Sequence, residues 1–154
     1  MLIAVDFDGT IVEHDYPRIG EEKPFATEVL RRLLHHRNML MLWTVREGDL
    51  LQEAIDWCAE RGVKFAAING EWTEAFAALC PEQATSRKPD ADLFIDDKSI
   101  SGLPTWTEIH EILSTGKSYR QLISEQVHQQ IAEMENTPPT PKWMFWKRRN
   151  KQEK

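Results

Sequence analysis

Two short apolar runs, each ending on a polar residue, set the strongest limit on how this chain folds. Residues 2–5 (LIAV) lead into Asp6, and residues 39–43 (MLMLW) lead into Thr44. An unbroken apolar run, unlike an alternating one, is typical of a strand that is buried on both faces, as in a parallel sheet. The fold is therefore expected to start from the middle of a core.

Between these two runs, and between them and two later strand candidates, lie segments whose apolar residues recur at helical spacing. Strands that alternate with helices predict an α/β sandwich with a mainly parallel sheet. Gly62 is placed to cap one helix at its carboxyl end, and Thr105 with Glu108 has capping-box spacing before another. The predicted strands are 2–5, 39–43, 64–68 and 91–95, and the predicted helices are 24–34, 49–61, 72–79 and 105–116.

Beyond residue 116 the pattern changes. Ser118 and Gln121 have capping-box spacing before a helix whose narrow apolar stripe needs a partner. The segment 137–142 (TPPTPK) cannot continue that helix, because proline lacks the amide donor. We therefore expect a globular domain over 1–116, a C-terminal helix over 117–136, and a Pro-rich linker with an aromatic and basic tail over 137–154.

Charge is distributed unevenly along the 154 residues, whose formal sum is −6. Residues 142–154 hold six basic groups and one acidic group, whereas the rest of the chain holds 13 basic and 24 acidic groups. An acidic body argues against a protein that wraps nucleic acid phosphates. The tail interleaves Trp143, Phe145 and Trp146 with basic residues, which suits a peripheral membrane surface, an anionic partner or the acidic body itself.

Several protein classes are disfavoured by what the sequence lacks. No apolar run is long enough to span a bilayer and no basic segment precedes the first strand, so neither a transmembrane segment nor secretion is expected. Cys58 and Cys80 are expected to be thiols in a reducing cytoplasm. Cysteine and histidine do not cluster at zinc-ligand spacing.

Polar residues collect where the predicted strands end. In an open parallel α/β sheet, ligands bind beyond the carboxyl ends of the strands. One carboxylate at a strand end is explained by solvation alone, but a whole set on one rim favours a binding site. The set comprises Asp6 and Asp8 after the first strand, Thr44 and Arg46 after the second, and Asp96 and Asp97 after the last, with Lys88 leading into that strand.

Four of these segments resemble, in order, the motifs of the haloacid dehalogenase-like (HAD) phosphohydrolases. DFDGT (6–10) resembles the first motif, LMLWT the second, RKP the third and LFIDD the fourth, and together they span about residues 2–113. The resemblance implies a three-layer sandwich with a Rossmann-like sheet. It also implies a hydrolase that cleaves phosphomonoesters through an aspartyl phosphate.

The resemblance assigns roles that the residue types can perform. Asp6 is the expected nucleophile, and Asp8 the expected general acid and base. Converging carboxylates would repel an anionic substrate, so a hard cation is required and Mg²⁺ suits oxygen ligands. Its expected ligands are Asp6, the backbone carbonyl of Asp8 and either Asp96 or Asp97.

Three further side chains are candidates for contacts with the phosphoryl group. Thr44 is expected to donate a hydrogen bond to it, and Lys88 to neutralise charge, with Arg87 as the rival for that role. Arg46 is expected to make a bidentate phosphate contact, and the alternative is an ion pair with Asp49 at a helix start.

No segment is long enough for the cap domain that most HAD enzymes insert after the first motif or between the second and third. The sequence therefore resembles the capless branch of the family. The loop 12–24 is the expected substitute, with His14, Tyr16 and Arg18 as candidate substrate contacts, unless it is an ordinary surface loop.

Two other functions remain open at this stage. The same chemistry would serve a phosphotransferase or a nucleic acid end phosphatase. A non-catalytic binding or scaffold protein could keep the fold and act through its tail, or through a helix over 118–135 that mediates homo-oligomerisation.

Overall fold

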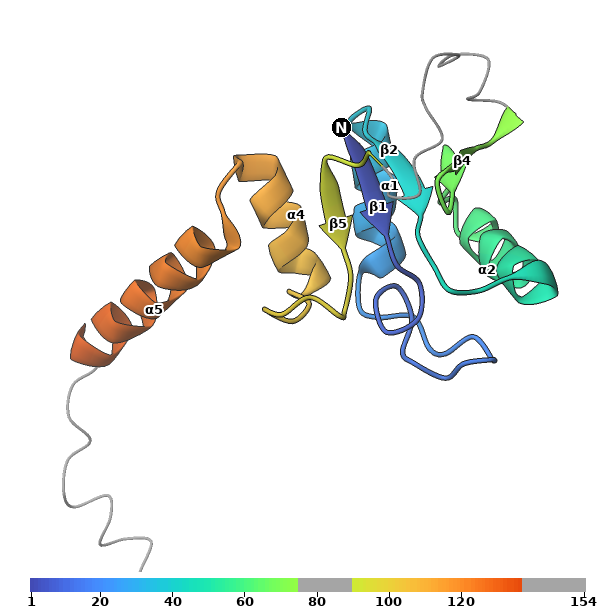
Figure 1. Ribbon diagram of the computed structural model, residues 1–154. Helices are drawn as coiled ribbons and strands as arrows, with labels where there is room; N and C mark the ends of the chain where they lie inside the picture. Colours follow the sequence, from blue (N-terminus) through green and yellow to red (C-terminus); the bar gives the residue numbers. More distant parts are fainter. Residues whose placement is uncertain (75–89, 137–154) are drawn as a thin grey trace, which may run out of the picture. The chain divides into compact units, whose positions relative to one another are not determined.

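Residues 1–74 and 90–136 are described by the computed structural model, and they form a five-stranded sheet and four helices (Figure 1). The chain divides into two compact units between Ser114 and Thr115. The elements are β1 (Leu2–Val5), α1 (Ala26–His35), β2 (Met39–Leu42), α2 (Gly48–Glu60), β3 (Ala67–Ile68), β4 (Glu71–Trp72), β5 (Leu93–Ile95), α4 (Trp106–Thr115) and α5 (Tyr119–Asn136).

The sheet is mostly parallel, as the sequence predicts, and has the strand order β4-β3-β2-β1-β5. Strand β1 lies in the middle and pairs in parallel with both β2 and β5. In this register Val5 stands opposite Leu42 on one side and Ile95 on the other. The carboxyl ends of the three strands are therefore level, which brings the residues that follow them to one edge.

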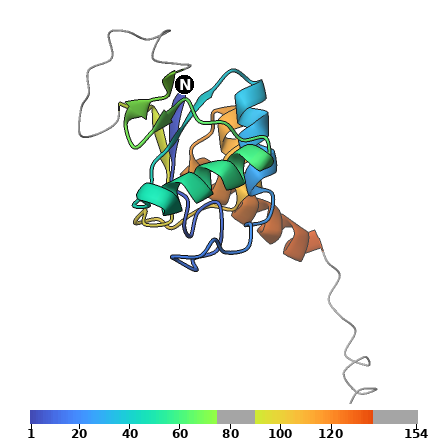
Figure 2. The same cartoon turned by 90° about the vertical axis from the view of Figure 1, so that its right-hand side faces the viewer.

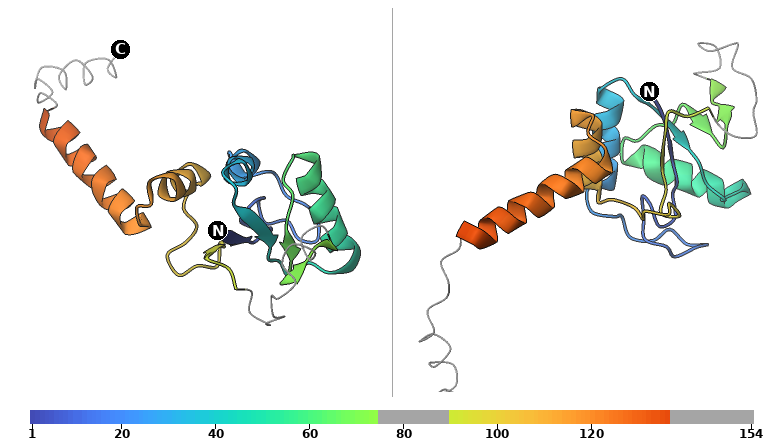
Figure 3. Two further views of the ribbon diagram at one scale, coloured as in Figure 1. Left: turned by 90° about the horizontal axis from the view of Figure 1, so that it is seen from above. Right: turned by 60° about the vertical axis from the view of Figure 1, so that its left-hand side comes forward.

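Strands β1 and β2 are buried on both faces, which confirms the expectation drawn from the unbroken apolar runs. Helices α1, α2 and α4 all pack on one face (Figures 2 and 3). On the opposite face of the sheet, Leu2, Ala4, Met41 and Ala67 form a second, smaller cluster. The strand side chains on the helix-covered face are Ile3, Val5, Leu40, Leu42 and Ile95. The predicted third layer stays a prediction, because the segment between β4 and β5 lies outside the described residues.

The predicted carboxyl end of α2 and the predicted start of α4 are confirmed, whereas α1 begins at Ala26 rather than at the predicted residue 24. Gly62 has a φ of 76° and ends α2 with paired bonds, from its own N–H to the Ala59 carbonyl and from the Val63 N–H to the Cys58 carbonyl. These two bonds define a Schellman motif. At α4 the Thr105 N–H donates to Glu108 Oε2 (2.8 Å), while the Glu108 N–H donates to Thr105 Oγ1 (3.3 Å).

The N-cap residue of helix α1 has no hydroxyl or carboxylate that could cap the helix. Phe25 stands at the N-cap position with a φ of 67° and no side-chain bond to the helix. Instead, Glu22 Oε1 accepts hydrogen bonds from the Thr27 N–H (3.0 Å) and the Thr27 hydroxyl (2.6 Å). A carboxylate from the preceding loop thus satisfies donors of the first turn.

The chain after β3 differs from the prediction. Asn69 and Gly70 both have positive φ, 46° and 87°, and form a two-residue turn of the kind that joins hairpin strands. Strand β4 therefore folds back antiparallel on β3, with Trp72 opposite Ala67. A helix starting at residue 72 was the wrong prediction, because the Asn-Gly turn signal there outweighs helical spacing.

Some predictions fall outside the described residues. They concern the rest of the 72–79 helix, Cys80, the candidate cations Arg87 and Lys88, and the linker and tail over 137–154. Of the two cysteines, Cys58 is described as a buried free thiol. Burial raises the pKa of this thiol to about 12.

Helix α5 opens with the predicted capping box, in which the Ser118 N–H donates to Gln121 Oε1 (2.9 Å). Its apolar stripe includes Ile123, Val127 and Ile131, all of which are exposed. Homo-oligomerisation through this helix stays a prediction. No helix among the described residues has both the length and the hydropathy needed to cross a bilayer.

Two leucines on α1 allow a matched test of the packing. Leu30 is fully buried in the main cluster, whereas Leu34 is only partly buried against it. We expect Leu30→Ala to lower the free energy of unfolding by about 3 kcal/mol and Leu34→Ala by clearly less, because the first leaves a cavity that the second does not. Urea unfolding of both variants measures this, and equal losses would contradict the described orientation of α1.

Candidate active site

The segment after β1 turns sharply away from the sheet edge. The Asp6 N–H still donates to the Ile95 carbonyl (3.0 Å), so Asp6 is fixed at the end of the parallel ladder. The Phe7 carbonyl then accepts bonds from the N–H groups of Ile11 (2.9 Å) and Val12 (3.2 Å). This single turn places Asp6 and Asp8 at the rim while Phe7 points into the core, where it is fully buried.

The Thr10 hydroxyl connects this turn to the end of β5. It donates to Asp6 Oδ2 (2.9 Å) and accepts a bond from the Asp97 N–H (3.0 Å). The Thr10 carbonyl accepts a further bond from the indole N–H of Trp106 on α4 (3.0 Å). One buried threonine therefore fixes the position of the Asp6 carboxylate relative to β5 and α4.

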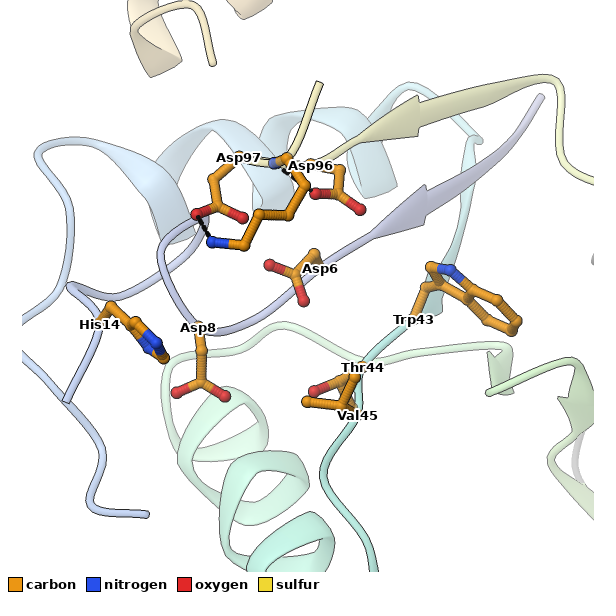
Figure 4. A pocket seen from close by; sticks show the side chains of 9 residues that line it. Asp6, Asp8, His14, Trp43, Thr44, Val45, Asp96 and Asp97 are labelled. Atoms are coloured by element: carbon orange, nitrogen blue, oxygen red, sulfur yellow. Dashed lines mark hydrogen bonds and ion pairs between the residues drawn. The ribbon is translucent and has the colours of Figure 1, made fainter. Parts of the chain in front are cut away.

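A cavity of about 360 Å³ opens at this edge of the sheet, with Asp6 near its centre (Figure 4). The predicted residues Asp6, Asp8, His14 and Thr44 line it, as do both predicted acidic residues after β5. In Figure 4 His14 and Asp8 lie on one side of Asp6, and Trp43 lies on the other. The full lining is Asp6, Asp8, His14, Trp43, Thr44, Val45, Asp96, Asp97 and Lys98.

Three carboxylates form an acidic cluster in the cavity. Oxygen atoms of Asp6, Asp96 and Asp97 all lie within 4.8 Å of one another. The pKa of Asp6 is raised to about 6, chiefly by burial and in smaller part by the charges of Asp96 and Asp97, while hydrogen bonds from Thr10 and the Phe7 backbone act in the opposite direction. Concentrated negative charge of this kind is relieved by a proton or by a cation.

Asp97 packs against the turn that carries Asp6. Its Oδ2 accepts a hydrogen bond from Lys98 Nζ (2.8 Å), while its buried Oδ1 has no hydrogen-bond partner in the described part of the chain. Gly9 lies so close that a Cβ built on it would stand 2.5 Å from Asp97 Oδ2, and its φ is 88°. Only glycine allows both this conformation and this approach.

Thr44 faces the cavity from the end of β2. Its N–H donates to the Asn69 side-chain oxygen (2.8 Å), and its hydroxyl oxygen accepts a bond from the Arg46 N–H (3.2 Å). The hydroxyl hydrogen is thus left to donate elsewhere, which is what the predicted contact with a phosphoryl oxygen requires.

Arg46 does not line the cavity. Its side chain is fully buried and makes a bidentate ion pair with Asp8, from Nε to Oδ2 and from Nη2 to Oδ1, both at 2.7 Å. A fully buried guanidinium cannot touch a substrate, so the structure contradicts the predicted phosphate contact. Neither does Arg46 pair with Asp49, because its described ion pair is with Asp8.

Loop 12–24 contributes one of its three predicted contacts to the cavity. His14 lines it, whereas the exposed Arg18 side chain is paired with Asp15 (2.9 Å) and lines no part of it. Tyr16 places its ring 5.4 Å from the Arg46 guanidinium, so its visible role is packing against a buried charge. A substrate contact of Arg18 therefore stays a prediction.

Besides Trp43 and Val45 in the lining, three polar residues that order the site were not predicted from the sequence. Thr10 belongs to the DFDGT segment, and its spacing of four from Asp6 was a usable signal. Asn69, which orders the backbone of Thr44, carried the turn signal before Gly70. Lys98 follows the acidic pair directly, and the hydrogen bond to Asp97 raises its pKa.

Comparison with known proteins gives one informative result. Neither protein-family models nor curated proteins match the chain. Among solved structures, a conserved protein from Bacteroides thetaiotaomicron is 51% identical, with a TM-score of 0.71 over 79% of this chain and 96% of that one. Identity at this level over nearly the whole of the other chain indicates common ancestry and a common fold. This chain therefore belongs to the family of that conserved Bacteroides protein.

Proposed function

We propose that this protein is a Mg²⁺-dependent phosphohydrolase of the HAD type, which cleaves phosphomonoesters through an aspartyl phosphate on Asp6. The observation that carries the proposal is the convergence of Asp6, Asp8, Thr44 and an acidic pair around one cavity at the carboxyl edge of a parallel sheet. These are the residue types and the place that phosphoryl transfer by an acidic nucleophile requires.

The proposed reaction has two steps. The Asp6 carboxylate attacks phosphorus, the bond from phosphorus to the leaving oxygen breaks, and the leaving oxygen takes a proton from Asp8. Water then attacks the phosphorus of the aspartyl phosphate and gives its proton to Asp8. Inorganic phosphate leaves, and the Asp6 carboxylate is regenerated.

The acidic cluster fits a bound Mg²⁺. Its three carboxylates supply hard oxygen ligands within 4.8 Å of one another, and Asp97 Oδ1 is a buried oxygen with no described partner. Asp6, Asp96 and Asp97 would hold the ion together with the backbone carbonyl of Asp8. When bound, the ion supplies positive charge that lets an anionic phosphate approach these carboxylates.

Charge and orientation at the transferring group come from two further residues. Thr44 donates its free hydroxyl hydrogen to a phosphoryl oxygen. Lys98 already pairs with Asp97 at the cavity and supplies an ammonium group there, which makes it a candidate, besides Lys88, for neutralising the phosphate. Lys88 lies outside the described residues and keeps its proposed role.

The proposal includes the capless, three-layer form of the fold. Loop 12–24 takes the place of a cap and brings His14 to the cavity. An uncovered site of this kind suits large phosphorylated substrates, and it leaves the leaving-group side open to solvent. The protein is proposed to act in the cytoplasm.

Removing the nucleophile tests the proposed chemistry. We expect Mg²⁺-dependent release of phosphate from p-nitrophenyl phosphate or from a panel of nucleotides, sugar phosphates and 3′-phosphorylated oligonucleotides. Asp6→Asn should lower kcat at least about a thousandfold, because it removes the attacking oxygen. Chelation of the metal should abolish turnover, and added Mg²⁺ should restore it.

The matched control for that experiment is Asp56→Asn, which alters an exposed aspartate on α2 away from the cavity and should leave kcat unchanged. Full activity of Asp6→Asn on the best substrate would exclude the aspartyl phosphate. A wild-type chain that binds Mg²⁺ but is inactive on the whole panel would instead favour a binding or scaffold protein.

Metal binding should be visible as a pH-dependent gain in stability. The pKa of Asp6 rises from 3.8 to about 6, so the folded chain binds its proton more tightly than the unfolded chain between these values. The free energy of unfolding of the metal-free protein should therefore fall by about 1 kcal/mol as pH rises from about 4 to about 6, after allowance for solvent screening. Added Mg²⁺ should raise Tm more at pH 7.5 than at pH 5, because protons compete for Asp6.

Calorimetry at both pH values measures this effect. Asp6→Asn should stabilise the metal-free protein at pH 7.5 and reduce the Mg²⁺-induced shift, whereas Asp56→Asn should do neither. A Mg²⁺-induced shift of equal size in Asp6→Asn would show that the ion binds elsewhere.

A further inference from the structure

Arg46 is a fully buried cation whose side-chain N–H groups donate hydrogen bonds to Asp8 and to two backbone carbonyls of loop 12–24. Nε and Nη2 donate to the two oxygens of Asp8, each at 2.7 Å. Nη1 donates to the Pro17 carbonyl (3.0 Å), and Nη2 also donates to the Arg18 carbonyl (2.8 Å). These bonds satisfy a charge that would otherwise be costly to bury.

Two aromatic rings lie close to the same side chain. Its guanidinium lies 5.1 Å from the centre of the Phe7 ring and 5.4 Å from that of Tyr16. Its backbone N–H donates to Thr44 Oγ1 (3.2 Å), which ties it to the end of β2. The Arg46 side chain therefore has little freedom to move, and this restricts the Asp8 carboxyl group that it binds.

Asp8 is the residue most constrained by this arrangement. A carboxylate attached by one bond can rotate about its terminal torsion, but a bidentate guanidinium fixes its plane. Asp8 lines the cavity while its side chain is only 7% exposed. The direction in which Asp8 presents itself to a substrate is thus set by Arg46.

We propose that Arg46 is a positioning residue for the proton transfers of Asp8, and that it locks loop 12–24 to this carboxylate. This inference rests on the proposed function and deepens it. Two backbone carbonyls of the loop share the guanidinium with Asp8, so the segment that carries His14 and the general acid move as one unit. Lysine cannot replace this arrangement, because one ammonium group cannot form the planar fork.

The test compares two leaving groups. Proton donation is essential when an alkoxide leaves, as from glycerol 2-phosphate, but p-nitrophenolate leaves without it. The ratio of kcat/KM for p-nitrophenyl phosphate to that for glycerol 2-phosphate should rise at least about tenfold in Arg46→Lys, as it should in Asp8→Asn. Arg32→Lys, an exposed change on α1, should leave the ratio as in the wild type.

The ratio does not depend on how much of a variant is folded, because both substrates report on the same active fraction. If Arg46→Lys folds too poorly to measure, Arg46→Gln is used in the same way. The double variant of Asp8→Asn with Arg46→Lys adds a second readout. Its kcat/KM for glycerol 2-phosphate should fall little below that of Asp8→Asn alone, since Arg46 acts through Asp8.

An unchanged ratio in active Arg46 variants, or losses that multiply in the double variant, would overturn the inference and leave the proposed function standing. A wild-type chain that is inactive on both substrates with Mg²⁺ present would overturn the proposed function, and this inference with it.

Discussion

The pairing of β1 with two parallel neighbours is the constraint on which the site depends. Because Val5 stands opposite both Leu42 and Ile95, the strands end level and the chain must turn there in three places. The residues after those ends become neighbours although they are far apart in sequence. A parallel sheet thus gathers carboxylates that repel one another at this short distance, and burial of the apolar side chains on both faces of β1 and β2 stabilises that arrangement.

Asp6 and Asp8 lie two residues apart, and their carboxyl groups have opposite electrostatic surroundings. The Asp8 carboxyl group is held from within, by two hydrogen bonds from the buried guanidinium of Arg46. Among the described residues, Asp6 has no ion pair of this kind, and burial together with the acidic pair after β5 raises its pKa to about 6. The difference suits two roles, since a carboxylate that attacks needs an external cation and one that transfers protons needs a fixed direction.

Most strands and helix ends could be predicted from the sequence, and the predictions that were wrong have physical causes. The strands, the Gly62 cap and the capping boxes follow from local spacing and were confirmed. The β4 hairpin was missed because a two-residue turn overrode a helical pattern. Arg46 was assigned to the substrate because a guanidinium can bind phosphate in a bidentate way, and only tertiary packing shows that its partners lie 28 to 38 residues away in the chain.

The measurement that tests the central proposal most directly is the location of a covalent phosphoryl group. The wild-type protein would be mixed with Mg²⁺ and p-nitrophenyl phosphate, quenched in acid within the first turnovers, digested and examined by mass spectrometry. The account predicts one added phosphoryl group on the peptide that contains Asp6, on the Asp6 carboxylate itself, and none in Asp6→Asn. A phosphoryl group on another residue, or active turnover with no phosphorylated peptide at any quench time, would contradict it.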